Sequence, residues 1–161
     1  MKILVSIFLS LFFFVSQELP DIREQYFSST KSKETAEKFY AVMSKCNKDT
    51  KTLLAYEGAA IALKSKYTGN LKAKKALFIE GVTQIEKAIK SDPNNAEIRL
   101  IRLSIQENTP KLLKYKANIE EDKKMLLATF DKQSQSLKEY IRNYIKQSKV
   151  FSEKEKQMLL K

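Results

Sequence analysis

The sequence contains no histidine and no tryptophan, and it has only one cysteine, three glycines and three prolines among 161 residues. The absence of histidine excludes Ser-His-Asp and Cys-His nucleophile systems and all histidine metal ligands. A single cysteine cannot form an internal disulfide or a zinc site, and three glycines cannot supply a glycine-rich phosphate loop. We therefore expect no catalytic site, no metal and no cofactor. The scarcity of glycine and proline also favours long helices over strands and turns.

The first seventeen residues have the order of a secretory signal peptide. Lys2 supplies a positive charge, residues 3–15 are apolar apart from two serines, and the chain turns polar at Glu18. This apolar stretch is short for a membrane span, which needs about 20 residues, whereas a signal peptide has this length and these flanks. We predict a signal peptide over 1–17 and an exported protein, periplasmic or secreted. An uncleaved N-terminal membrane anchor is the alternative.

Apolar residues recur every three or four positions along most of the chain after residue 33, which is the helical pattern. The predicted helices are near 32–46, 51–66, 71–91, 96–107, 110–130 with a break at 117–118, 134–147 and 152–160. Residues 18–33 are polar with few periodic apolar positions, so we expect a linker or loose N-terminal arm there. Residues 34–161 are expected to form a single all-α domain of five to seven helices stacked as antiparallel hairpins.

All three glycines have a predicted role. Gly58, with Ala59, Ala60 and Ala62, makes one part of the helix 51–66 small enough for another helix to approach closely. Gly69 follows the helix 51–66, where it is expected to supply a left-handed cap conformation. Gly81 lies inside the helix 71–91 and costs up to about 1 kcal/mol relative to alanine. We therefore expect a neighbouring helix to pack closely against Gly81.

The helix 96–107 is expected at the centre of the fold, because its apolar residues cover more than one face. Arg99 and Arg102 interrupt these faces one turn apart, and Gln106 follows one turn beyond. An arginine among apolar residues usually pairs with an internal carboxylate. The candidate partners are Glu57, Glu80 and Asp122. The alternative is a binding pocket in which the two arginines and Gln106 hold an anion or a carboxylate terminus.

The chain carries a net charge of +11 at pH 7. Basic residues form a stripe along the predicted helix 134–147, interleaved with Tyr140 and Tyr144: Lys138, Arg142, Lys146 and Lys149. Such a pattern can bind nucleic acid, but an exported protein rarely meets it, so an anionic envelope polymer or lipid is the partner that the stripe predicts. A solvated lysine-rich helix face is the alternative, and it is favoured because acidic residues are interspersed along almost the whole chain.

One motif is recognisable, around the turn Asp92–Asn95. Ile85, Ala88 and Pro93 follow one another at intervals of three and five residues, and Gly81 lies four residues before Ile85. This pattern resembles the junction between tetratricopeptide repeats, in which small residues let two helices approach and a proline ends the second. The resemblance covers about one expanded repeat, 56–97. Any helix–turn–helix joint built on Asp-Pro-Asn is the alternative.

The resemblance implies a right-handed array of helix hairpins that presents a concave surface to a protein or peptide. Together with the predicted export, it indicates a non-enzymatic binding or scaffold protein of the cell envelope with an unidentified protein or peptide partner. The alternative is a small basic periplasmic chaperone, or a binder of anionic envelope polymers or lipids. Nucleic acid is not expected as a partner.

Overall fold

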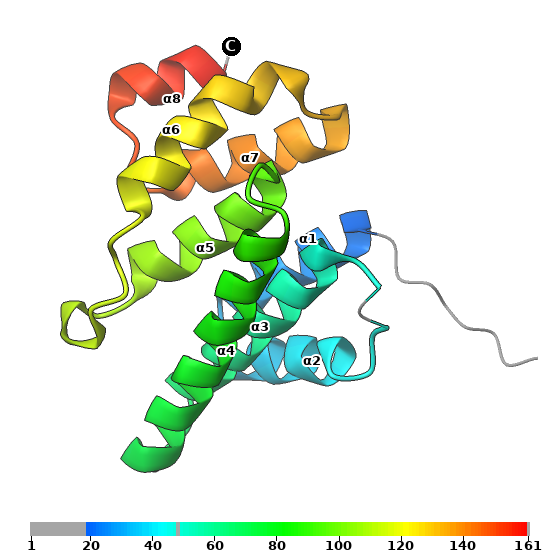
Figure 1. Ribbon diagram of the computed structural model, residues 1–161, viewed down its shortest axis with the longest axis vertical. Helices are drawn as coiled ribbons and strands as arrows, with labels where there is room; N and C mark the ends of the chain where they lie inside the picture. Colours follow the sequence, from blue (N-terminus) through cyan, green and yellow to red (C-terminus); the bar gives the residue numbers. More distant parts are fainter. Residues whose placement is uncertain (1–18, 48, 161) are drawn as a thin grey trace, which may run out of the picture.

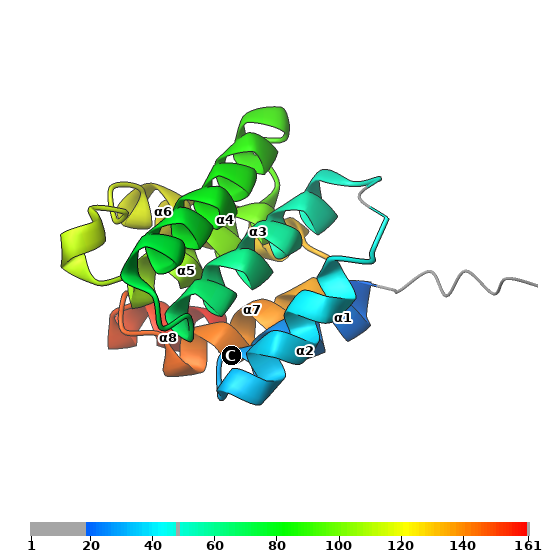
Figure 2. The same ribbon diagram turned by 90° about the horizontal axis from the view of Figure 1, so that it is seen from below.

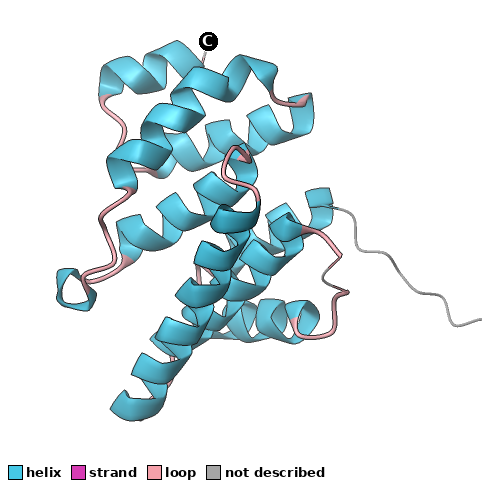
Figure 3. Cartoon of the chain, in the orientation of Figure 1, coloured by secondary structure: helices cyan, strands magenta, loops and turns pink. Residues whose placement is uncertain are grey.

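The described part of the chain is built of helices alone. A computed structural model describes residues 19–47 and 49–160, and these residues contain no β-strand, which confirms the all-α class. The predicted signal peptide lies outside them. The α-helices (Figure 1, Figure 3) are α1 (Leu19–Ser29), α2 (Lys33–Met43), α3 (Lys51–Lys66), α4 (Leu71–Ser91), α5 (Ala96–Asn108), α6 (Ile119–Thr129), α7 (Gln135–Gln147) and α8 (Glu153–Leu159). Two short 3-10 turns, η1 (Lys111–Leu113) and η2 (Phe130–Lys132), follow α5 and α6.

The prediction of a linker or loose arm over residues 18–33 is wrong. This segment contains α1, which contributes to the core. Ile22 is fully buried and Tyr26 nearly so, and the Tyr26 ring packs against that of Phe39 on α2 with centroids 5.6 Å apart. The other two buried residues of α1 are polar, Arg23 and Ser29. The pattern was too sparse to indicate a helix, because only two large apolar residues mark the buried face. With α1 included, the described residues hold eight helices rather than the predicted five to seven.

The helix α5 lies at the centre, as its sequence predicts. Ile98 and Ile101 belong to a core cluster shared with α1, α2, α3 and α4. Leu100 and Leu103 belong to a second cluster shared with α6, α7 and α8. Figure 1 shows α5 between these two groups of helices. The central helix therefore joins two cores, each on a different face.

The helices α3 and α4 form an antiparallel hairpin whose bounds match the predicted helices, and it closes most tightly at two glycines. A Cβ atom added to Gly81 would lie 2.5 Å from the carbonyl oxygen of Gly58 and 2.6 Å from the backbone nitrogen of Ala62. This confirms the expected close approach at Gly81. The other residues of the predicted joint are buried on α4 or lie in the turn after it: Ile85, Ala88 and Pro93.

The chain between α5 and α6 is a loop rather than the helix predicted from residue 110 onward. Lys111–Leu113 form only the turn η1, and Lys114 follows in the left-handed conformation with a φ of 50°. A segment this short, with a lysine at each side of its two leucines, has no continuous apolar face to bury. An α-helix therefore restarts only at Ile119.

The substitution Gly81→Ala is expected to lower the free energy of unfolding by about 2 kcal/mol or more, because the new Cβ overlaps backbone atoms of α3. This loss exceeds the gain in helix propensity of about 1 kcal/mol. Urea denaturation measures it.

Gly69→Ala is the matched control. No atom lies within 4 Å of a Cβ added there, and Gly69 has no positive φ, so the predicted left-handed cap is wrong. This variant is expected to change stability by no more than about 0.5 kcal/mol. Equal stabilities of the two variants would contradict the close approach of α3 and α4.

Candidate functional site

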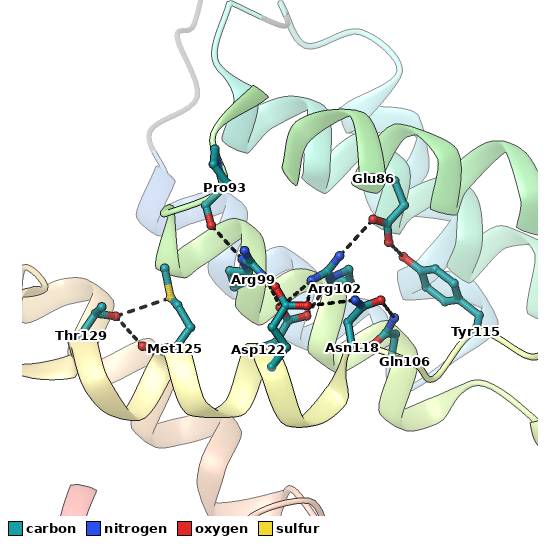
Figure 4. Close-up of polar contacts among 11 residues, drawn as sticks. Glu86, Pro93, Arg99, Arg102, Gln106, Tyr115, Asn118, Asp122, Met125 and Thr129 are labelled. Atoms are coloured by element: carbon teal, nitrogen blue, oxygen red, sulfur yellow. Dashed lines mark hydrogen bonds and ion pairs between the residues drawn. The ribbon is translucent and has the colours of Figure 1, made fainter. Parts of the chain in front are cut away.

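The two arginines of α5 form a buried ion cluster with α6 (Figure 4). Arg102 donates from Nε and Nη2 to the two carboxylate oxygens of Asp122, each at 2.7 Å, and Asp122 is fully buried. Arg99 donates from Nη1 to Asp122 at 2.9 Å and from Nε to the Pro93 carbonyl at 2.8 Å. Of the three predicted partners, Asp122 is the one that these bonds join to the arginines. The contacts support the internal ion pair over the open anion pocket.

Two further carboxylates, which the sequence did not indicate as partners, complete this cluster. Glu121 accepts a hydrogen bond from Arg99, and that bond lowers the pKa of Glu121. Glu86 on α4 accepts from Arg102 Nη1 at 3.0 Å and from the Tyr115 hydroxyl at 2.6 Å. The cluster therefore links α4, α5, α6 and the loop between α5 and α6.

Gln106 extends the same contact surface instead of lining an open site. Its side chain is fully buried, and its Nε2 donates to Asn118 Oδ1 at 3.3 Å. Its Oε1 has no hydrogen-bond partner among the described residues, a situation that costs about 1–3 kcal/mol. Gln106 thus connects the end of α5 to the start of α6.

A second buried ion pair lies between α1 and α5. The Arg23 guanidinium donates two parallel hydrogen bonds to the Glu97 carboxylate, from Nε at 2.8 Å and from Nη2 at 2.7 Å. The Tyr56 hydroxyl donates to the same carboxylate at 2.7 Å. Burial raises the pKa of Tyr56, and it raises that of the neighbouring Tyr26 to about 12. Sequence reasoning missed this pair because Arg23 lies in the segment expected to be loose. The helical spacing of Ile22 and Tyr26, which are four residues apart, was the signal that could have indicated a helix there.

The basic stripe predicted on α7 is partly engaged in packing. The Nε of Arg142 donates to the Leu159 carbonyl of α8 at 2.8 Å, and its guanidinium lies 5.1 Å from the centre of the Phe130 ring. The ammonium of Lys138 lies 5.8 Å from the same ring. Lys146 and Lys149 are exposed. The four residues therefore do not act as one equivalent set of solvated charges.

A groove of about 970 Å³ has the size typical of a ligand site. Its lining comes from α1, α3, α4, α5, the loop after α5, the first residue of α6, and α7 with the residues that follow it. Half-buried aromatic and aliphatic side chains supply much of its apolar surface: Phe27, Leu63, Phe78 and Ile119. The tip of the α3–α4 hairpin and the loop after α5 project on the same side of the molecule in two perpendicular views (Figure 1, Figure 2).

Two leucines on these projecting segments are almost fully exposed. Leu71 at the start of α4 is 81% exposed, and Leu112 in η1 is 88% exposed. Both line the groove. The helical periodicity places Leu71 on the apolar stripe of the helix 71–91 and Leu112 in the helix expected from residue 110, and neither side chain is buried. The signal that could have found Leu112 is its position two residues after Pro110, in a short segment flanked by Lys111 and Lys114.

The charges of the groove are almost all positive. Its lining includes five lysines and a single acidic residue, Glu107. The Glu107 carboxylate already accepts hydrogen bonds from the Tyr144 hydroxyl, from Ser148 Oγ at 2.9 Å and from the Lys149 backbone at 2.6 Å. Within residues 19–47 and 49–160, none of the five lysine ammonium groups forms an ion pair. The five are Lys66, Lys74, Lys75, Lys116 and Lys149.

Comparison with known proteins gives no match to any family model, curated protein or solved structure. Among the residues that the structure describes, no group of three or more acidic or cysteine side chains could hold a metal ion. In the same residues no helix is both long and apolar enough to cross a membrane.

The substitution Asp122→Ala is expected to lower the free energy of unfolding by about 3–5 kcal/mol, because it leaves two buried guanidinium groups without their shared acceptor. Thermal and urea unfolding measure this loss. The control is Glu120→Ala on the same helix, since Glu120 is exposed and pairs with Lys123. It is expected to cost about 1 kcal/mol or less. A similarly small loss for Asp122→Ala would show that the cluster contributes little to the fold.

Proposed function

We propose that the chain is an exported, non-enzymatic binding protein of the cell envelope, which holds a segment of a protein partner in the groove. The main support for this proposal is a pair of leucines at the groove, Leu71 and Leu112, whose side chains are almost fully exposed to solvent. Apolar surface gathered around a concave feature is typical of interaction sites. A partner that covers both leucines gains about 1.5–3 kcal/mol for each one fully buried.

The helix arrangement is consistent with a scaffold role. Gly58 and Gly81 close the α3–α4 hairpin, and the turn at Pro93 leads directly into α5. We propose that this unit is a tetratricopeptide-like joint in a right-handed stack, as the residues from 56 to 97 suggest. In such stacks the concave side takes the ligand, and here the groove is lined by α3, α4 and α5 together.

Export is supported by the sequence pattern over residues 1–17. The runner-up function, recognition of anionic envelope polymers or lipids by the basic stripe, has weaker support. Two of its four side chains, Lys138 and Arg142, pack against Phe130. A protein or peptide partner in the groove is therefore the function that the geometry favours.

The double variant Leu71→Ser/Leu112→Ser tests the proposal. Random peptides displayed on phage are selected on the wild-type chain, and the affinity of each selected peptide is measured by fluorescence anisotropy. We expect the double variant to weaken binding by about tenfold or more, because both leucines lose their apolar contact with the peptide. Its unfolding midpoint should stay near that of the wild type, since both side chains are exposed.

The matched control is Ile79→Ser/Met158→Ser, which removes two exposed apolar side chains outside the groove. These changes are expected to leave the affinities unaltered. Selected peptides that bind the two double variants equally well would refute the assignment of the groove, and so would a selection that enriches no peptide.

A further inference from the structure

We infer that the segment held in the groove is an acidic amphipathic helix of the partner protein. The inference rests on the proposed function and adds the chemistry of the partner: an apolar stripe that covers the exposed leucines, with carboxylates on both flanks. Three features of the groove support the inference: its positive charge, the lack of a strand edge for an extended peptide among the described residues, and the distribution of its lysines.

The charge of the groove selects for carboxylates. Five lysine ammonium groups line it, and the single carboxylate, that of Glu107, already accepts three hydrogen bonds from the protein itself. Lys66 is the last residue of α3, and Lys74 and Lys75 lie near the start of α4. A partner with acidic residues is attracted by this field, and a basic one is repelled.

The described residues contain no strand edge to which an extended peptide could add. Two hydroxyls of the groove are already used within the protein: that of Ser65 donates to the Ala62 carbonyl at 2.6 Å, and that of Thr109 donates to the Ile105 carbonyl at 2.7 Å. An α-helix satisfies its backbone hydrogen bonds internally, so a helical segment suits this surface better than a strand that needs an edge to pair with.

The distribution of the lysines favours a peptide over a lipid. They come from three separate parts of the chain: the α3–α4 hairpin tip, the loop that carries Lys116, and the segment after α7 that carries Lys149. A single anionic headgroup would require the charges to converge at one end of an apolar cavity. Carboxylates spread along both flanks of a helix match charges that are spread around an apolar groove.

Three synthetic helical peptides test the inference. All three carry the same leucine stripe at positions i, i+4 and i+7, and their remaining positions are glutamate, glutamine or lysine. Fluorescence anisotropy measures binding to the full chain at low and at physiological salt. We expect the glutamate peptide to bind at least about tenfold more tightly than the glutamine peptide at low salt. The difference between the two affinities should decrease as the salt concentration rises, because salt screens the charges. The lysine peptide should not bind.

Charge reversal of the hairpin tip, Lys66→Glu/Lys74→Glu/Lys75→Glu, is expected to reverse the order of the glutamate and lysine peptides. The milder variant Lys66→Gln/Lys74→Gln/Lys75→Gln should narrow the difference in affinity between the glutamate and glutamine peptides, while Lys116 and Lys149 keep part of it. The matched control makes the same change in net charge at exposed lysines outside the groove, and it should preserve the wild-type order. It is Lys87→Glu/Lys90→Glu/Lys124→Glu.

The three peptides could bind the wild-type chain equally well and fail to bind the Leu71→Ser/Leu112→Ser variant. This result would overturn the preference for acidic partners and leave the proposed function standing. Binding of phosphatidylglycerol vesicles without binding of the glutamate peptide would overturn the inference in favour of a lipid. If none of the three peptides binds, the helical partner is wrong, and the displayed-peptide selection then decides whether the groove binds any other peptide.

Discussion

The carboxylate of Asp122 is the contact on which the arrangement of the second half of the molecule depends. It accepts hydrogen bonds from both arginines of α5 while fully buried, so α6 can dock only where those two charges are neutralised. The loop between α5 and α6 must then connect two helix ends whose positions are fixed. Tyr115 in this loop donates to Glu86, which also accepts from Arg102, so the same cluster ties the loop to α4.

The groove is a consequence of these constraints. On one side the ring of Tyr115 meets that of Phe78 edge to face, with centroids 6.0 Å apart, which holds the loop beside the α3–α4 hairpin. On the other side Glu107 holds the residues that follow α7 by accepting from Ser148 and from the Lys149 backbone. The Glu107 carboxylate is thus held by neutral donors of α7 and the residues after it, and the five lysines of the groove walls have no carboxylate partner within the described residues.

Periodicity and turn residues were enough to predict α3, α4 and α7 with their bounds, because capping residues and turns mark their ends, and the apolar residues on several faces of α5 predicted its central place. They did not predict the loop at 110–118, where the two leucines suggested a helix. They could not predict α1, in which the charged Arg23 occupies an inward position and pairs with Glu97, 74 residues away. For the buried cluster, the sequence indicated the arginines and Asp122. It could not reveal the groove, because Leu71 and Leu112 look like core residues until tertiary packing leaves them outside.

The central claim is that the leucines and lysines around the groove, rather than the basic face of α7, hold the partner. The most direct measurement is the mapping of backbone amide chemical shifts in the wild-type chain during titration with the leucine-glutamate peptide. The account predicts the largest changes around Leu71, Leu112 and Lys116, with little change in the middle of α7. Changes concentrated around Lys138, Arg142 and Lys146, with the groove unaffected, would contradict it.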